Sequence, residues 1–398
     1  MIKCRHVIIM ILMEKILIFN NYYLPAKNYG GPVTSMVSII ENCSDEFEFF
    51  VIAANHDFGD TAIFENIQPG WNIVGKAKVK YISLSDIYFK PAAIRKILDE
   101  VKPDMVWSAG ILVPSDKWFI AWQCKKMNIP YLISPRGEVC YNAFHTKHLK
   151  KAVVAFIARV IGVYKSVYFH SASELEYDGL KRFYGISEKR IFMVPNIPGL
   201  IKAKKHEINK NAGQIRIVFL SRIQDTKNLL LAIEAAELLK GDVIFDIYGP
   251  KESEEYWHLC EAAIDKAPDN VHIEYKGKVT PEKVRDVFSQ YHCFLFPTIT
   301  ENYGHAIAEA LSVSCPLVLT KGATPWDDIH GKAGYICKNG SKQDFAQALE
   351  LIERMDYEEY SRLCNSVTEF YDKKISDDNS VQRHKEMIKK CIGSAYEK

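Results

Sequence analysis

The sequence predicts an α/β protein with two doubly wound, parallel-sheet domains. Three observations indicate this fold class. Short apolar runs alternate with helical stretches along almost the whole chain, as expected for parallel sheets that are covered on both faces. A polar, aperiodic stretch at residues 198–213, rich in Lys and Asn, divides the chain into two halves of similar size. The length of 398 residues also exceeds the comfortable size of one hydrophobic core.

The first twelve residues, "MIKCRHVIIMIL", combine a basic start with a short apolar run, a pattern faintly like a signal peptide. Glu14 and Lys15 follow almost at once, and no small-residue cleavage site appears. The run is also too short to span a bilayer. We therefore interpret Met13 as the natural start and residues 1–12 as an extension.

The N-terminal domain is predicted over residues 1–197. Its buried strands are expected at residues 15–19, 47–53, 79–83, 104–108, 130–134, 166–170 and 190–196. The C-terminal domain is predicted over residues 214–375, after the linker. Its strands are expected at residues 215–220, 243–249, 271–277, 293–298, 316–320 and 334–337, with helices at 228–240 and 281–290. Residues 376–398 are predicted to form a helix that packs back on the N-terminal domain.

The composition is that of an ordinary soluble globular protein, with 48% hydrophobic and 25% charged residues. The net charge of +2 gives no overall attraction to nucleic acid, so an anion site must be local. None of the ten cysteines forms a Cys-x-x-Cys pair. That pattern indicates reduced, buried thiols in a cytosolic protein and argues against a zinc site.

Two basic residues follow the first strand of the C-terminal half, in "IVFLSRIQDTKNLLLAIEAAELL". Arg222 comes just after the strand end, and Lys227 is expected to start the next helix. Two cations beside the positive end of a helix suit a diphosphate. The alternative, ordinary surface charge with a solvated Lys227, stays open from this stretch alone.

In the N-terminal half, Gly30 and Gly31 precede a helical stretch in "LPAKNYGGPVTSMVSII". Two glycines let a backbone approach a ligand closely, and the N–H groups of a helix start then face an anion. A flexible turn is the alternative.

Two glutamates flank a predicted helix start in "TENYGHAIAEAL". Glu301 is in the loop, Gly304 is at the helix start, and Glu309 lies more than one turn inside. Neither glutamate suits a pure capping role, because Glu309 is too far in and Glu301 is not a favoured cap residue. Placed around one cleft, the pair can accept hydrogen bonds from two separate polyols of one ligand. A solvated acidic turn is the alternative.

These stretches together resemble the retaining glycosyltransferases of family four, which have the GT-B fold of two Rossmann-like domains across a cleft. That family carries a Glu-x7-Glu motif, here Glu301 to Glu309, with upstream basic residues matching Arg222 and Lys227. The segments "GG", "SPRGEV", "SASELE" and "VPNI" follow the family's order of landmarks. The resemblance covers nearly the whole chain, and its combination of motifs is specific although each motif alone is not.

The resemblance implies a role for each matched residue. Arg222 and Lys227 would grip the diphosphate of a UDP- or GDP-sugar and stabilise the departing nucleotide. Glu309 would bind the ribose, and Glu301 would bind hydroxyls of the transferred sugar. Further contacts with the nucleotide sugar would come from the backbone near Tyr303, Gly304 and His305, and from Gly30 and Gly31 when the cleft closes.

The sequence departs from the family after the fifth strand, where many members have a His-Asp pair and this chain has "SPRGEVCYNAF". Arg136 and Glu138 occupy the region, as in a subset that resembles polysaccharide-building enzymes. Arg136 is a candidate for contacting the nucleotide sugar or an acidic acceptor. The alternative is a structural pair with Glu138. His145 is a weaker candidate.

The segment 147–165 reads as a basic amphipathic helix. We favour an ordinary packed helix with a solvated polar face. Docking on an anionic bilayer is the alternative, which a lipid-linked acceptor would favour.

The predicted function is transfer of a sugar, with retained configuration, to a glycan or lipid-linked glycan in surface polysaccharide synthesis. No Asp-x-Asp stretch suits a metal, since Asp327 and Asp328 are adjacent and lie elsewhere. We therefore expect no metal and no cofactor, no nucleic-acid partner, and a cytoplasmic location, with possible contact at the inner membrane face. Two alternatives stay open: a nucleotide-sugar epimerase of GT-B architecture, and a non-catalytic nucleotide-sugar-binding protein.

Overall fold

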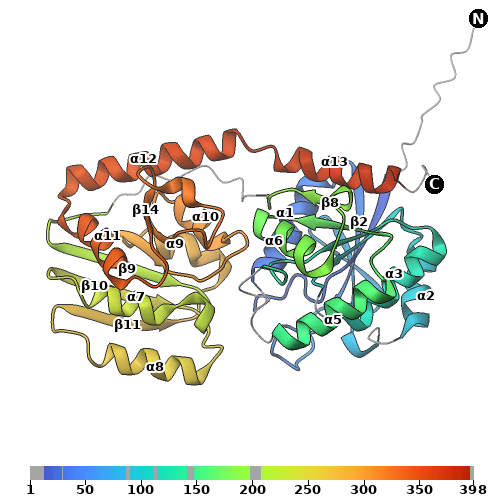
Figure 1. The fold of residues 1–398 in the computed structure, drawn as a ribbon, viewed down its shortest axis with the longest axis horizontal. Coiled ribbons are helices and arrows are strands. Elements are labelled where there is room, and N and C mark those ends of the chain that lie inside the picture. The colour runs from blue at the N-terminus through green and yellow to red at the C-terminus, as the bar shows by residue number, and fades with distance from the viewer. Residues whose placement is uncertain are drawn as a thin grey trace, which may run out of the picture.

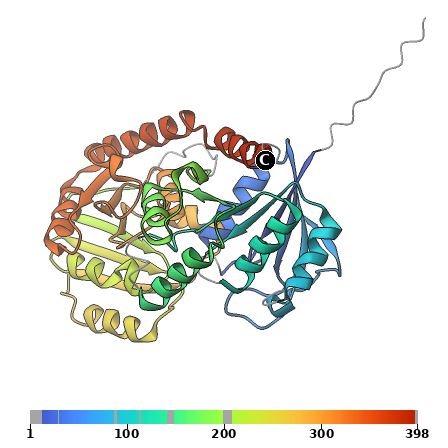
Figure 2. The ribbon, with the colours of Figure 1, turned by 45° about the vertical axis from the view of Figure 1, so that its right-hand side comes forward.

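A computed structural model describes residues 13–28, 30–86, 90–111, 114–140, 148–197 and 208–394. Two β-sheets build two domains that lie side by side, and the C-terminal helices run along one edge of both (Figure 1, Figure 2). The segment interpreted as an N-terminal extension and His145 lie outside the described residues. Among the helices that are described, none is both long and apolar enough to cross a bilayer.

The N-terminal sheet has eight strands in the order β3-β4-β2-β1-β5-β6-β7-β8. They are β1 (Glu14–Phe19), β2 (Phe47–Ala54), β3 (Trp71–Val74), β4 (Ala77–Ile82), β5 (Met105–Ala109), β6 (Tyr131–Ser134), β7 (Val167–Ser171) and β8 (Ile191–Met193). All neighbours are parallel except β3 and β4. The sequence did not predict β3, which is short and joins β4 through a two-residue turn at Gly75 and Lys76. This sheet is therefore mixed at its edge, not wholly parallel as expected.

Helices cover both faces of this sheet. One face carries α2 (Pro91–Val101), α3 (Pro114–Met127) and α5 (His148–Ile161), whose buried residues share one apolar cluster. The other face carries α1 (Gly31–Cys43), together with α13 (Ser380–Gly393) from the far end of the chain. The short helix α6 (Glu174–Gly179) follows β7. The layers match a doubly wound domain.

The C-terminal sheet has six parallel strands in the order β11-β10-β9-β12-β13-β14. They are β9 (Gln214–Leu220), β10 (Asp242–Tyr248), β11 (Val271–Gly277), β12 (Cys293–Phe296), β13 (Leu317–Thr320) and β14 (Gly334–Cys337). The helices around them are α7 (Leu229–Ala236), α8 (Glu254–Ile264), α9 (Val284–Phe288), α10 (His305–Leu311), α11 (Lys342–Arg354) and α12 (Tyr357–Ser376). One apolar cluster fills this domain. The α/β class and the two Rossmann-like domains are thereby confirmed.

The C-terminal tail is helical but interrupted. Helix α12 begins at a capping box in which Asp356 and Glu359 satisfy each other's backbone N–H groups, and its buried residues belong to the C-terminal core. The chain then breaks at residues 377–379 before α13 packs into the N-terminal core through Met387, Ile388, Cys391 and Ile392. Lys385 Nζ also pairs with Asp45 Oδ2 at 2.6 Å. One tail thus packs on both domains.

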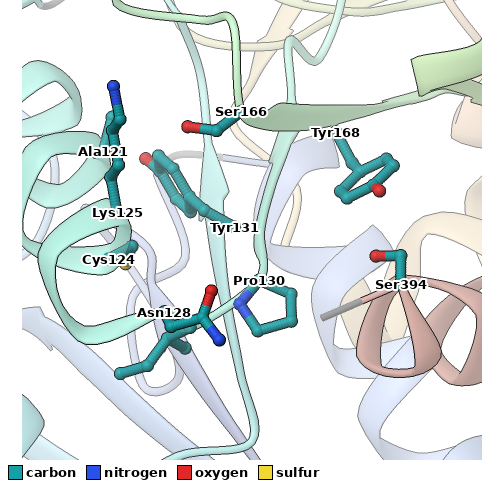
Figure 3. A pocket seen from close by; sticks show the side chains of 10 residues that line it. Ala121, Cys124, Lys125, Asn128, Pro130, Tyr131, Ser166, Tyr168 and Ser394 are labelled. Atoms are coloured by element: carbon teal, nitrogen blue, oxygen red, sulfur yellow. The ribbon is translucent and has the colours of Figure 1, made fainter. Parts of the chain in front are cut away.

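The nine cysteines within the described residues are all buried and free. A small cavity of about 60 Å³ lies beside Cys124, where Tyr131, Ser166 and Tyr168 mark the amino ends of β6 and β7 (Figure 3). Ligands of doubly wound sheets bind at the opposite, carboxyl ends of the strands. This cavity is therefore remote from the candidate site.

Candidate functional site

Loops from the carboxyl ends of both sheets meet each other. Ser35 in α1 and His305 at the start of α10 approach to 2.8 Å between Oγ and Nε2. Ser173, which follows β7, donates its hydroxyl to the side-chain oxygen of Asn302 at 2.7 Å. The carboxyl edges of the two sheets therefore face one another, and the loop after β12 contacts the N-terminal domain.

Lys227 and Glu301 form an ion pair at this junction, with 2.6 Å between Nζ and Oε2. The side chain of Lys227 is only 9% exposed. Their loops are joined by the backbone as well, because the N–H of Ile299 donates to the carbonyl of Thr226 at 2.9 Å. The sequence predicted that Lys227 starts α7, and this prediction is wrong. Lys227 ends a 3-10 turn, and Asn228 with φ 58° separates it from the helix.

The electrostatic balance keeps Glu301 ionised. Burial alone would raise the pKa of this carboxyl, but the charge of Lys227 and its hydrogen bond outweigh burial and hold the pKa below its ordinary value. Glu301 is thus a carboxylate whose one oxygen is held by Lys227. Its other oxygen accepts the N–H of Asn302 at 3.2 Å.

Arg222 is paired elsewhere. Its Nη1 donates to both carboxylate oxygens of Glu252, at 2.9 and 3.1 Å, and half of its side chain is exposed. The structure therefore places both predicted cations after β9, as the sequence indicated, and pairs each with a different carboxylate. An incoming diphosphate would compete with Glu252 and Glu301 for these two cations.

Glu309 lies inside α10 in a different environment. Burial raises its pKa to about 7, an effect that the charge of Arg285 opposes. Within the described part of the chain, no hydrogen bond to its carboxylate is present. The two glutamates of the motif therefore differ: Glu301 is ion-paired and charged, whereas Glu309 titrates near neutral pH.

The segment between the two glutamates is shaped for close approach. Gly304 has φ 81°, which strains any residue with a side chain, and a Cβ there would lie 2.7 Å from Ile307 Cδ1, so Ile307 would have to shift. Burial lowers the pKa of His305 to about 4, partly offset by Glu301, so this ring is neutral at pH 7. The carbonyl of Tyr303 accepts from Trp326 Nε1.

The two N-terminal glycines lie opposite this segment. Gly30 has φ 58° and precedes α1, and Gly31 is the first residue of that helix. A Cβ on Gly31 would be 3.4 Å from His305 Cδ2. That distance is an ordinary van der Waals contact, so α1 lies close to the start of α10 at Gly31.

Arg136 extends the site from the N-terminal domain. It has φ 56°, and its Nη1 donates to Asn196 Oδ1 at 3.0 Å. Its Nε and Nη2 are buried with no acceptor among the described residues. Burial lowers its pKa to about 10, which the nearby charge of Glu176 opposes, so Arg136 stays charged at pH 7. Glu138, its suggested partner, instead accepts the backbone N–H of Ile111 at 2.6 Å.

A large hollow adjoins this group of residues. It has a volume of about 760 Å³ and is lined by Asn196 and Tyr303, by Trp326 after β13, and by the end of α12 with residues 377–379. The volume is within the range of small-molecule sites. Among the described residues, no three His, Cys, Asp or Glu side chains gather as metal ligands.

Sequence reasoning missed the residues through which the domains meet. Asn302 lies within the quoted motif, and Ser35 is one helical turn after Gly31, on the same face of α1. Ser35 could have been found from its position on the same face of α1 as Gly31. Asn196 lies in the landmark segment "VPNI", although no role was predicted for it, and Glu252 carried no signal of its own.

The family comparison agrees with this geometry. Residues 201–369 match the family model described as glycosyl transferases group 1. These residues contain β9 to β14 and every predicted site residue of the C-terminal domain. The C-terminal domain thus resembles the glycosyl transferases group 1 over residues 201–369.

A curated protein is also similar to part of the chain. D-inositol 3-phosphate glycosyltransferase from Mycobacteroides abscessus is 26% identical over 161 residues, which is 39% of this chain and 36% of the relative. The match thus spans about a third of that relative's length.

Solved structures resemble the chain over nearly its whole length. HepE of Anabaena, solved in complex with UDP and glucose, has a TM-score of 0.69 and 12% identity, covering 96% of this chain and 100% of HepE. Sucrose-phosphate synthase from Thermosynechococcus elongatus has a TM-score of 0.68 and 11% identity, with the same coverage of both chains. At such identities the likeness shows the GT-B fold shared with these proteins.

Proposed function

We propose that the chain transfers a sugar from a nucleotide-diphosphate sugar to a glycan or lipid-linked glycan, with retained anomeric configuration. The observation that carries this proposal is the ion pair of Lys227 and Glu301 at the domain junction, inside the matched glycosyltransferase domain. A UDP- or GDP-sugar suits the two cations after β9. HepE, with the same fold, was solved with UDP and with UDP-glucose.

Each side chain has one proposed task. Arg222 and Lys227 turn from their carboxylates to the diphosphate and stabilise the charge that develops on it. Glu301, released from Lys227, accepts hydroxyl hydrogens of the transferred sugar. Glu309 accepts those of the ribose, and Arg136 supplies its free N–H groups from the opposite domain. Backbone N–H groups at Tyr303, Gly304 and His305, with Gly30 and Gly31 opposite, complete the site.

The transfer step itself uses the substrate's phosphate. The bond between the anomeric carbon and the diphosphate oxygen breaks, and the acceptor oxygen attacks from the same face of the sugar. The acceptor's proton passes to the departing phosphate oxygen. No metal takes part, because Arg222 and Lys227 carry the charge that a metal would supply. The acceptor would belong to a capsule, O-antigen or exopolysaccharide.

A panel of UDP-, GDP- and dTDP-sugars tests the proposal. Binding to the native state raises the apparent melting temperature, so thermal stabilisation identifies the nucleotide. The stabilising donors are then incubated with glycan and lipid-linked acceptors, and the products are analysed. Sugar transfer supports the proposal. Formation of an epimer without transfer, or binding without any product, would overturn it in favour of an epimerase or a binding protein.

A further inference from the structure

Helix α5 exposes a continuous apolar stripe to solvent. Its members recur three, four, seven and eight residues after the first, so they share one helical face. They are Val153, Phe156, Ile157, Val160 and Ile161, with 57%, 67%, 38%, 69% and 63% of their surfaces exposed. We call these five residues the α5 stripe. Contiguous exposed apolar surface of this kind marks an interaction site on a soluble domain.

The helix is oriented opposite to the expected packing. Ala155 and Ala158 face the core beside α2 and α3, whereas the large side chains point outward. An ordinary surface helix buries its large apolar residues and exposes polar ones. Small residues suffice to pack α5 on the sheet, so the α5 stripe does not stabilise the isolated domain.

The sequence segment that contains the stripe carries charge of one sign. Residues 139–173 contain no Asp or Glu, although 49 of the 398 residues in the chain are acidic. The same segment contains five basic residues: Lys147, Lys150, Lys151, Arg159 and Lys165. Arg159 and Lys165 are exposed at the carboxyl end of α5. The stripe suits an apolar layer, and the basic residues beside it suit an anionic one. A surface with anionic groups outside and an apolar interior complements both.

We propose that α5 docks this protein on an anionic phospholipid bilayer. The helix has 14 residues and is thus about 21 Å long, which is too short to span a bilayer but suited to lie in its interface. The α5 stripe would enter the acyl boundary, and the exposed Arg159 and Lys165 would contact lipid phosphates. A second copy of the chain would bring an identical basic surface to this one, so it is a poorer occupant.

The position of α5 ties docking to the cleft. In the sequence, α5 follows the loop after β6 that carries Arg136. In both ribbon views α5 lies on the edge of the molecule opposite α12 and α13, which would therefore stay clear of the bilayer (Figure 1, Figure 2). Resting on the proposed function, we infer that docking presents the N-terminal side of the cleft to lipid-linked acceptors.

Vesicle sedimentation with the full chain tests the docking. Phosphatidylcholine vesicles with and without phosphatidylglycerol are compared for the wild type and for the double variant Phe156→Glu/Val160→Glu. We expect the wild type to bind the phosphatidylglycerol vesicles and to be released by salt, because surface charges are screened. The double variant should bind at least about tenfold more weakly, since it loses two apolar anchors and gains two like charges.

The control is Leu259→Glu, which changes a leucine that is 56% exposed on α8 in the C-terminal domain. Its vesicle binding should equal that of the wild type. Wild-type chain that stays in the supernatant, or a double variant that binds as well as the control, would overturn the proposal. A double variant that converts a wild-type dimer to a monomer without vesicle binding in either would assign the stripe to a second copy instead.

Docking and catalysis can fail separately. Thermal stabilisation by UDP or GDP reports on the nucleotide site of each variant and should be unchanged in the double variant. A wild-type chain that binds vesicles but transfers no sugar keeps this inference and overturns the proposed function. A wild-type chain that transfers sugar to soluble acceptors but does not bind vesicles keeps the proposed function and overturns this inference.

Discussion

The basic residues on the two sides of the cleft differ in whether they are paired. On the C-terminal side, Lys227 is paired with Glu301, and Arg222 is paired with Glu252. On the N-terminal side, Arg136 buries two N–H groups that have no acceptor among the described residues. The C-terminal side is therefore neutralised internally and must exchange partners to bind an anion. The N-terminal side already holds hydrogen-bond donors that have no acceptor within the described ranges and that a bound ligand would satisfy.

This difference has an energetic meaning. A buried donor without a partner costs about 1–3 kcal/mol, and such costs persist mainly where binding or chemistry needs them. Arg136 also adopts φ 56°, a conformation that few non-glycine residues use. By contrast, the pair of Lys227 and Glu301 orders the cleft before a ligand arrives. The comparison predicts that variants on the two sides fail in different ways.

Removing a C-terminal cation should have the largest effect. We expect Lys227→Ala to lower kcat at least about a hundredfold, because one preorganised charge for the departing diphosphate is lost. Arg222→Ala should lower kcat to a similar extent. Steady-state kinetics with the donor found in the thermal screen measures both.

Stability separates these two variants. Lys227→Ala leaves Glu301 without its counter-charge, so it should also lower the melting temperature. Arg222 is half exposed, so Arg222→Ala should unfold like the wild type. Lys227→Ala/Glu301→Gln should recover stability but not turnover. Near-normal turnover in both single variants would contradict the assignment of the diphosphate site.

Substitutions of Glu301 and Glu309, both on the C-terminal side, should impair different properties. Glu309→Gln should weaken free nucleotide binding, because a charged hydrogen bond to the ribose is worth roughly 1–3 kcal/mol. Glu301→Gln should leave free nucleotide binding largely intact and impair transfer and discrimination between donor sugars. Calorimetry with nucleoside diphosphates, beside turnover with two donor sugars, measures this. The reverse pattern would mean that the nucleotide sugar binds in the opposite orientation.

The raised pKa of Glu309 adds a pH test. Because this pKa is about 7, raising the pH from about 6 to about 8 ionises the carboxyl and should strengthen nucleotide binding up to roughly tenfold. The raised pKa also affects folding. As the pH rises from 4.5, the ordinary pKa of a glutamate, toward about 7, the contribution of Glu309 to the stability of the fold decreases. Glu309→Gln should remove both dependences, whereas Glu301→Gln should keep them.

On the N-terminal side, Arg136→Gln should weaken transfer by about tenfold or more, since a charge-assisted contact to the ligand is lost. It should leave the melting temperature nearly unchanged, because removing two buried nitrogens without an acceptor offsets the loss of the hydrogen bond to Asn196 and of the charge beside Glu176. Turnover with neutral and with uronic-acid donors, and with phosphate-bearing acceptors, identifies which anion depends on Arg136. Arg362→Gln, an exposed arginine of α12, is the control. Equal turnover in both variants would remove Arg136 from the site.

The contact between the two sides should matter less. Ser35→Ala removes the hydrogen bond to His305, which is worth about 1 kcal/mol, so KM for the nucleotide sugar should rise a few-fold while kcat changes little. Ser38→Ala, on the same helix, is the comparison variant. A larger fall in kcat than in affinity would indicate that Ser35 contacts the reacting groups.

Chelation should have no effect at all. Activity is expected to survive exhaustive EDTA, because Arg222 and Lys227 supply the charge for the leaving group. Transfer that is lost in EDTA and restored by magnesium or manganese would contradict the metal-free design of the C-terminal side.

The sequence could predict most of the strands and could group the site loops, because the carboxyl ends of parallel strands share one edge. It could not predict β3, which is held by a hairpin to β4 and has little apolar pattern of its own. The contact of Ser35 with His305 depends on the distance between domains, which no local pattern encodes. The periodicity of α5 identified an apolar face but not the side to which it turns, because alanines on the other face also pack well.

The C-terminal tail has a mechanical consequence. The polypeptide crosses from one domain to the other twice, first between residues 197 and 208 and again at residues 377–379. Two rigid bodies joined at two separate points bend about the line through those points and resist twisting in other directions. Opening and closing of the cleft would therefore be a rotation of one domain about a single hinge axis. Ending the chain at residue 377 would leave a single joint, and the domains would then sample many orientations, few of which bring Ser35 against His305.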